Sequence, residues 1–228
     1  MSFVDTPDNY RYAWYLRPVL ALLRLRLHGL PEPVRLWARM PLAFIGFQLM
    51  LKTLERKTSP LDGRLRALVR TRIAQLNSCH FCVDLNASHA LDRGVTPEQL
   101  QDLAGFQDSL RFSDAEKAAL AYAEAITGTG IEIDASLIER LRQAFGDEGI
   151  VELAALAAHQ NLSAKFNAAL GVPAQGFCMT AHRVGGTAGL SDTRIPISDQ
   201  ADGLSHSRQM FHCCALRDQT FNLSICFN

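Results

Sequence analysis

Two cysteines separated by two residues, Cys79 and Cys82, are the side chains best placed for chemistry in this sequence. Residues three apart on a helix face the same side, close enough for a disulfide. Asn77 and Ser78 interrupt the preceding helical pattern, so Cys79 opens the next helix. The free peptide N–H groups and the dipole at such a helix start favour a thiolate. A thiolate attacks a peroxide or a disulfide, and a neighbouring cysteine resolves the product as an intramolecular disulfide, so the spacing predicts a redox-active pair.

Two other uses of the pair stay open. A zinc site of four cysteines lacks ligands, because Cys178 is the only other cysteine before residue 179. Zinc bound by Cys79, Cys82 and histidines remains an alternative. So does an inert buried pair, because free cysteine often behaves as a small hydrophobic residue.

Three histidines and one asparagine are candidates to assist the thiols. His80 lies inside the CxxC motif, where an imidazole can favour a thiolate. The alternative interpretation, a surface histidine with no role in the site, has equal support. Asn86, one turn after Cys82, can donate a hydrogen bond but cannot shuttle protons. His89 lies two turns after Cys82, roughly 10 Å away, and reaches the sulfur only through a bend or a water. His159 belongs to the last long helix and is either a core residue or a partner of the thiols.

The elements that position these residues are all helices. Apolar residues recur every three to four positions, and the alternation typical of strands is almost absent. Proline, glycine and capping residues set the boundaries. The expected helices cover residues 12–27, 34–54 with Pro41 as a break or a start, 64–76, 79–94, a segment after Thr96, 114–126, 135–145 and 147–170. Three parts follow: an N-terminal helical segment (1–34), a helical domain (35–178) and a low-order tail rich in Ser, Thr and Gly (179–228).

Composition narrows the function classes. The chain has 228 residues, 48% of them hydrophobic, and 23 basic residues balance 23 acidic ones. This balance gives no reason to expect nucleic acid or a membrane as a partner. The longest apolar stretch, residues 41–51, is shorter than the ~20 residues that span a bilayer. The six cysteines do not form a secreted disulfide framework, so we expect a soluble, cytoplasmic protein.

Residues 35–178 resemble the carboxymuconolactone decarboxylase family, in particular its alkylhydroperoxidase D-like branch. The resemblance rests on four motifs, and the tail lies outside it. The motifs are Arg72-Ile73-Ala74-Gln75-Leu76-Asn77, Cys79-x-x-Cys82, Ala90-Leu91-x-x-Gly94 and Gln160-Asn161-x-x-x-x-Phe166-Asn167-x-x-Leu170-Gly171.

The resemblance implies a compact, multi-helix fold that assembles into homo-oligomers. Family members with a CxxC pair are peroxidases or disulfide reductases that use no bound metal or flavin, so no cofactor is expected. By resemblance, Cys82 attacks the peroxide. Cys79 then resolves the intermediate and exchanges with an external thiol reductant. The expected function is a thiol-dependent, peroxiredoxin-type peroxidase or disulfide oxidoreductase acting on a peroxide or disulfide substrate.

The sequence departs from the family pattern at two positions. Well-studied members carry a glutamate where this chain has Ala67, and a histidine where it has Asn86. The proton relay of the family therefore does not carry over, although the two cysteines do. This departure favours a second hypothesis, in which the protein is a non-redox enzyme like the decarboxylases of the family or a helical oligomeric binding protein.

Overall fold

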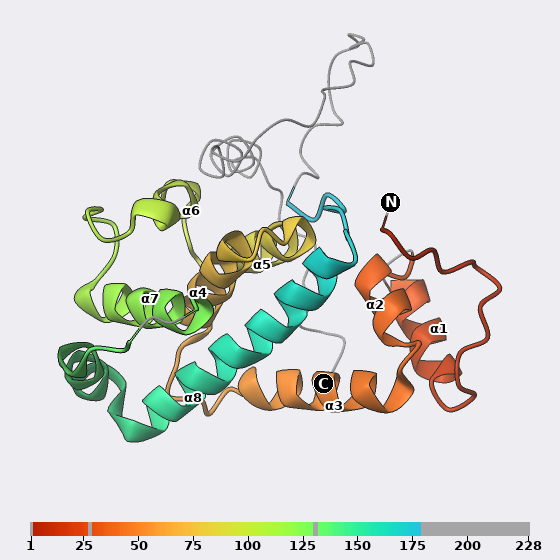
Figure 1. Ribbon diagram of the computed structural model, residues 1–228, viewed down its shortest axis with the longest axis horizontal. Coiled ribbons are helices and arrows are strands. Elements are labelled where there is room, and N and C mark those ends of the chain that lie inside the picture. Colours follow the sequence, from red (N-terminus) through yellow and green to blue (C-terminus); the bar gives the residue numbers. More distant parts are fainter. Residues whose placement is uncertain (1, 27–28, 130–131, 179–228) are drawn as a thin grey trace, which may run out of the picture.

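The computed structural model describes residues 2–26, 29–129 and 132–178, and within these ranges every regular element is a helix (Figure 1). The predicted all-α, multi-helix fold is therefore confirmed. The predicted low-order tail, residues 179–228, lies outside the described residues. No helix in the described part of the chain is long and apolar enough to cross a membrane.

Three helices form the N-terminal part: α1 (Arg17–Arg26), α2 (Glu32–Trp37) and α3 (Pro41–Leu54). The predicted start of the first helix at residue 12 was wrong. Pro18 is tolerated only in the first turn of a helix, so a helix reaching back to residue 12 would place it in the interior. Pro41 starts α3, in agreement with the prediction. The three helices enclose a small separate core made by Leu16, Leu20, Leu23, Trp37, Ala38 and Phe44.

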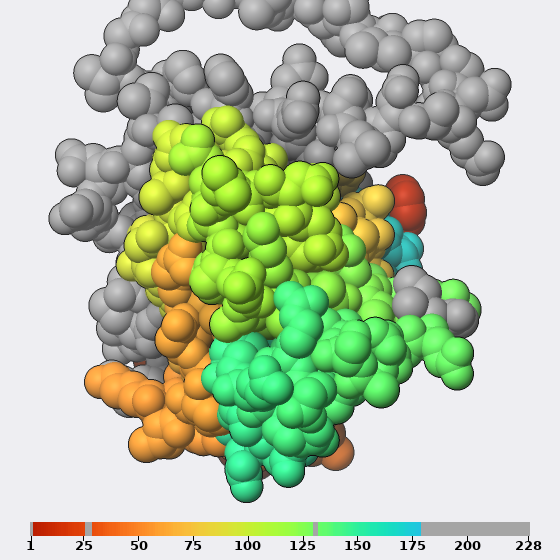
Figure 2. Space-filling view, turned by 90° about the vertical axis from the view of Figure 1, so that its left-hand side faces the viewer, coloured from red at the N-terminus to blue at the C-terminus, as the bar shows by residue number. Residues whose placement is uncertain are grey.

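The main core surrounds α4 (Gly63–Leu76), which is buried along almost its whole length. It packs against α5 (His80–Asp92), α7 (Asp114–Thr127) and α8 (Ala135–Ala169). Two short elements, α6 (Pro97–Asp102) and the 3-10 helix η1 (Leu103–Gly105), connect α5 to α7. In the side view of Figure 2, the segment around α6 and α7 covers the upper part of the face, and α8 and α3 cover the lower part.

The helix boundaries follow the local signals. Thr96 and Ser113 each form a complete capping box, as predicted. Gly146, at φ 69°, breaks α8 where the sequence predicted the end of one helix and the start of the next. The part of α8 after this break crosses α4 and α5 and also contacts α3, as Figure 1 shows. One helix thereby joins the main core to the N-terminal part.

Candidate active site

The cysteine pair lies at a tight corner between α4 and α5. Ser78 adopts the left-handed conformation with φ 50°. The Cys79 N–H donates to the Ala74 carbonyl at 3.0 Å, and the Ser78 N–H donates to the Gln75 carbonyl at 3.0 Å. These two bonds form a Schellman motif, which usually has glycine where this chain has Ser78. Cys79 is therefore both the end of one helix motif and the N-cap of the next.

The two sulfurs are joined in a disulfide, with 5.2 Å between the Cα atoms. The Cys79 Sγ also accepts a hydrogen bond from the peptide N–H of Cys82 at 3.2 Å, as an N-cap side chain does. Both cysteines are buried, with 1% and 3% of their surface exposed. The predicted CxxC at a helix N-terminus is thus present in its oxidised form.

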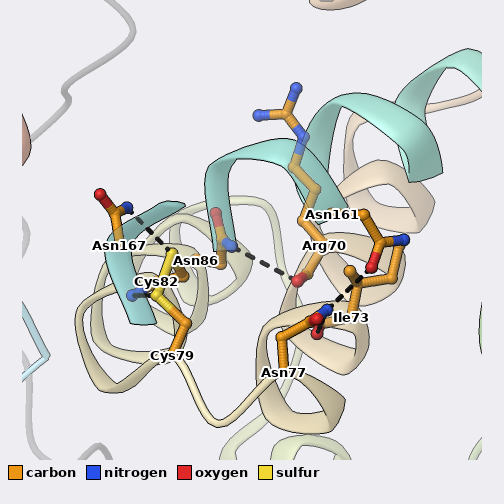
Figure 3. Close-up of a disulfide and its surroundings, with 8 residues drawn as sticks. All are labelled: Arg70, Ile73, Asn77, Cys79, Cys82, Asn86, Asn161 and Asn167. Carbon is orange, nitrogen blue, oxygen red and sulfur yellow. Dashed lines mark hydrogen bonds between the residues drawn. A yellow bond between two sulfur atoms is a disulfide. The ribbon is translucent and has the colours of Figure 1, made fainter. Parts of the chain in front are cut away.

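A third side chain touches the pair from another helix. The Asn167 amide on α8 donates to the Cys82 Sγ with 3.4 Å between nitrogen and sulfur (Figure 3). Asn167 is only 1% exposed, and its Oδ1 has no partner among the described residues. A fixed amide donor stabilises negative charge on the sulfur that it faces.

A cavity of about 210 Å³ opens beside Cys82. Its walls come from the N-terminal helices, from α4 and α5, and from the last part of α8 with Phe177; they are mainly apolar, and Cys79 does not contribute to them. The polar wall residues lie on α4, α5 and α8, apart from Gln48 on α3. The lining includes Leu23, Trp37, Phe44, Phe47, Phe81, Leu85 and Phe177 as apolar residues and Gln48, Arg70, Asn86, His89, His159, Gln160, Ser163 and Asn167 as polar ones.

His159 is a neutral imidazole in this wall. Its Nε2 lies 3.2 Å from the Phe47 carbonyl, which can only accept, so Nε2 carries the proton and Nδ1 keeps its lone pair. The ring stacks on Phe47 with 4.2 Å between the centroids. Burial and, to a smaller extent, the nearby charge of Arg70 lower the pKa of His159 from 6.5 to about 4. Nδ1 is buried without a partner among the described residues.

The end of the described chain closes one side of the cavity. The Asp84 carboxylate accepts hydrogen bonds from the peptide N–H groups of Gln175, Phe177 and Cys178, at 2.9, 3.0 and 2.8 Å. These bonds hold the Phe177 ring edge-on to Phe81, with 5.7 Å between the centroids. Asp84 is only two residues from Cys82, so the pair and this wall share one helix.

The structure brings some of the predicted site residues together and leaves others apart. Cys82, Asn86, His89 and His159 all line the cavity. His80 is exposed at the start of α5 and lies outside the cavity. The Asn86 amide donates to the Arg70 carbonyl at 3.4 Å rather than to a sulfur, as Figure 3 shows.

Sequence reasoning missed Arg70, Asp84 and Phe177 as parts of the site. Asn167 was noted only within the motif of the closing helix, without a role. Its spacing from Cys82 in the chain gives no signal, because the contact depends on how α8 crosses α5. At Ala67, where well-studied relatives have an acid, a small side chain is buried in α4. Among the residues that the structure describes, no three His, Cys, Asp or Glu side chains gather into a metal site.

Comparison with known proteins places this geometry in a family. Residues 43–125 match the carboxymuconolactone decarboxylase family. The uncharacterized protein YnjA of Escherichia coli (strain K12) is 42% identical over 163 residues, which are 72% of this chain and 90% of YnjA.

Two solved structures share the fold. The alkylhydroperoxidase AhpD core of an uncharacterized peroxidase-related protein from Ralstonia eutropha JMP134 superposes with a TM-score of 0.68 and 20% identity, over 77% of this chain and 94% of that one. The debrominase Bmp8 superposes with a TM-score of 0.63 and 21% identity, over 77% of this chain and 92% of Bmp8. The chain therefore belongs to the carboxymuconolactone decarboxylase family and has the fold of its alkylhydroperoxidase D-like proteins.

Proposed function

We propose that the protein is a thiol-dependent peroxidase or disulfide oxidoreductase that works through Cys79 and Cys82. The observation that carries this proposal is the unequal placement of the two sulfurs. Cys82 lines the cavity, whereas Cys79 does not line it and is joined to Cys82 by the disulfide. A substrate in the cavity meets Cys82 first, and Cys79 is already within bonding distance of the product.

The reaction balances with two cysteines and one peroxide. The Cys82 thiolate attacks one oxygen of the peroxide, the O–O bond breaks, and the other oxygen leaves as an alcohol or water after taking a proton. Cys82 is then a sulfenic acid. The Cys79 thiolate attacks its sulfur, the disulfide forms, and the hydroxide that leaves takes up a proton to become water. An external thiol reductant, which we expect in the cytoplasm, returns the pair to two thiols.

Three features of the site support this sequence of steps. The helix start and the Asn167 amide stabilise negative charge at the pair. His159 presents the lone pair of Nδ1 among the residues that line the cavity, so in the absence of the family acid and base we assign it the transfer of the Cys82 thiol proton to the leaving oxygen. We propose no role in proton transfer for the exposed His80. His89 lines the cavity, and we propose that it supports the site from this position.

Trapping of the sulfenic acid tests the two roles separately. The Cys79→Ser variant should accumulate a sulfenic acid on Cys82 after one equivalent of peroxide, detected by dimedone labelling and mass spectrometry. The Cys82→Ser variant should not be labelled at Cys79. Each single variant is the control for the other, and both should lose peroxide turnover supported by a dithiol. Full turnover in the double serine variant would refute the proposal.

A second function is favoured by one specific observation. Ala67 and Asn86 replace the acid and the base of well-studied relatives, which fits a non-redox enzyme or a binding protein of the same family. Alkylation of both thiols separates the two functions, because a decarboxylase-like reaction would survive it and the redox reaction would not.

A further inference from the structure

The cavity beside Cys82 has mainly apolar walls that include polar side chains with unsatisfied groups. Four wall residues carry buried side-chain atoms that have no hydrogen-bond partner among the described residues: Arg70, His159, Gln160 and Asn167. Buried polar atoms are almost always paired in folded proteins. Arg70 and Gln160 leave N–H donors unpaired, and donors of this kind at one cavity indicate a ligand that accepts hydrogen bonds.

The charge around Arg70 is positive. Arg70 is only 8% exposed, and its Nη1 pairs with Glu55 at 3.1 Å. Arg93 and Arg66 approach the same carboxylate at 2.9 and 3.9 Å. Within the described ranges, Glu55 is the only carboxylate that forms ion pairs with these three guanidinium groups.

One carboxylate therefore faces three cations. Burial lowers the pKa of Arg70, as do the charges of Arg93 and Arg66, which is the electrostatic situation that a bound anion relieves. The Nε and Nη2 donors of Arg70 are the ones that Glu55 leaves unused. A guanidinium presents such donors in a planar fork that matches a carboxylate.

The apolar walls of the cavity are suited to an aromatic body. Trp37 and Phe47 stack with 4.9 Å between the centroids, and Phe81 meets Phe177 edge-on. Pockets of this kind, with mostly apolar walls and a few convergent polar groups, are typical of small-molecule sites. The cavity volume of about 210 Å³ suits a small molecule.

We propose that this cavity binds a small organic monoanion, a carboxylate with an aromatic or short apolar body, whose charged end lies at Arg70. The inference concerns binding alone and uses the same cavity as the proposed function. If Cys82 is the attacking thiol, the substrate is a peroxide of this class, with its carboxylate at Arg70 and its reactive oxygens toward Cys82.

The experiment compares phenylacetate with 2-phenylethanol, which has a similar body but no charge. Calorimetric titration of the oxidised full-length protein, without peroxide, should show phenylacetate binding at least about tenfold more tightly, because hydrogen bonds to a charged group are the stronger kind. The Arg70→Gln variant should lose this preference. Arg66→Gln is the matched control, since Arg66 approaches the same Glu55 but does not line the cavity. It should keep the preference.

A second measurement places the ligand and does not depend on the Arg70 variant folding. In the reduced protein, saturating phenylacetate should slow the alkylation of Cys82 several-fold. Gln160→Leu, which removes another unpaired donor from the wall, should weaken phenylacetate binding. Equal affinity for acid and alcohol, an unprotected Cys82, or a preference that persists in Arg70→Gln overturns the proposal. These experiments measure no peroxide turnover. They therefore test ligand binding even if the protein is not a peroxidase.

Discussion

Replacing Asn167 with leucine should lower the thiolate population of Cys82 without disturbing the fold. The amide donates to the Cys82 Sγ at 3.4 Å, and its Oδ1 is buried without a partner among the described residues. Leucine has nearly the same size and removes both the donor and the unpaired acceptor. The change removes an unpaired acceptor and a weak donor to sulfur together, so we expect a small net effect on stability.

The magnitude follows from the charge on the sulfur. A hydrogen bond to a charged group contributes about 1.5–3 kcal/mol, and we take about 1.5 because the contact to sulfur is long. This corresponds to about a tenfold smaller thiolate population below the midpoint of titration. The remaining thiolate becomes more nucleophilic, with a Brønsted slope of about 0.5, so the alkylation rate should fall only about threefold.

The assay uses reduced protein in a Cys79→Ser background. Ultraviolet absorbance of the thiolate across pH gives its population, and iodoacetamide gives the rate. Asn86→Leu is the matched control, because the Asn86 amide lies one turn from Cys82 but donates to the Arg70 carbonyl. A thiolate population unchanged in Asn167→Leu, or reduced equally in Asn86→Leu, would show that the α8 amide does not stabilise the sulfur.

Three further predictions concern stability and assembly. Ser78→Gly should raise the free energy of unfolding by about 0.5–1 kcal/mol in denaturant titrations, because glycine accepts the left-handed corner that serine occupies at a cost; a loss of stability would contradict this. His159 has its pKa lowered to about 4, so the unfolded chain binds the proton first as the pH falls. Stability should therefore decrease between about pH 6.5 and 4, by up to about 3 kcal/mol, and His159→Gln should flatten this dependence. We propose that the homo-oligomer implied by the family resemblance forms through Leu42 and Leu49, on one exposed side of α3. Changing both to lysine should reduce the mass found by light scattering; an unchanged mass would exclude this side as the contact.

Local signals predicted the helices well, because each boundary depends on a few neighbouring residues. The capping boxes at Thr96 and Ser113, the break at Gly146 and the helix start at Cys79 all follow from side chains within one turn. The exception is α1, where Pro18 fixes a later start than the apolar pattern predicts. The cysteine pair could be found for the same reason, since its chemistry depends on a spacing of three.

The rest of the site depends on contacts between distant segments. Arg70 looks like one more arginine of a helix, and its ion pair with Glu55, the residue that caps the end of α3, appears only in the fold. Phe177 enters the cavity wall because Asp84, 93 positions earlier, accepts its N–H. Neither contact has a local pattern. Pattern and spacing could single out the two cysteines as candidates, whereas the residues around them could be found only from the fold.

The hydrogen bonds to the Asp84 carboxylate also determine how the segment from Gln175 to Cys178 opens. Three peptide N–H groups depend on this single acceptor, so they should be released together rather than one by one. In native-state hydrogen exchange, the amides of Gln175, Phe177 and Cys178 should therefore exchange with one common opening free energy. If ligands enter where Phe177 moves away, the frequency of this opening sets an upper limit on their rate of association.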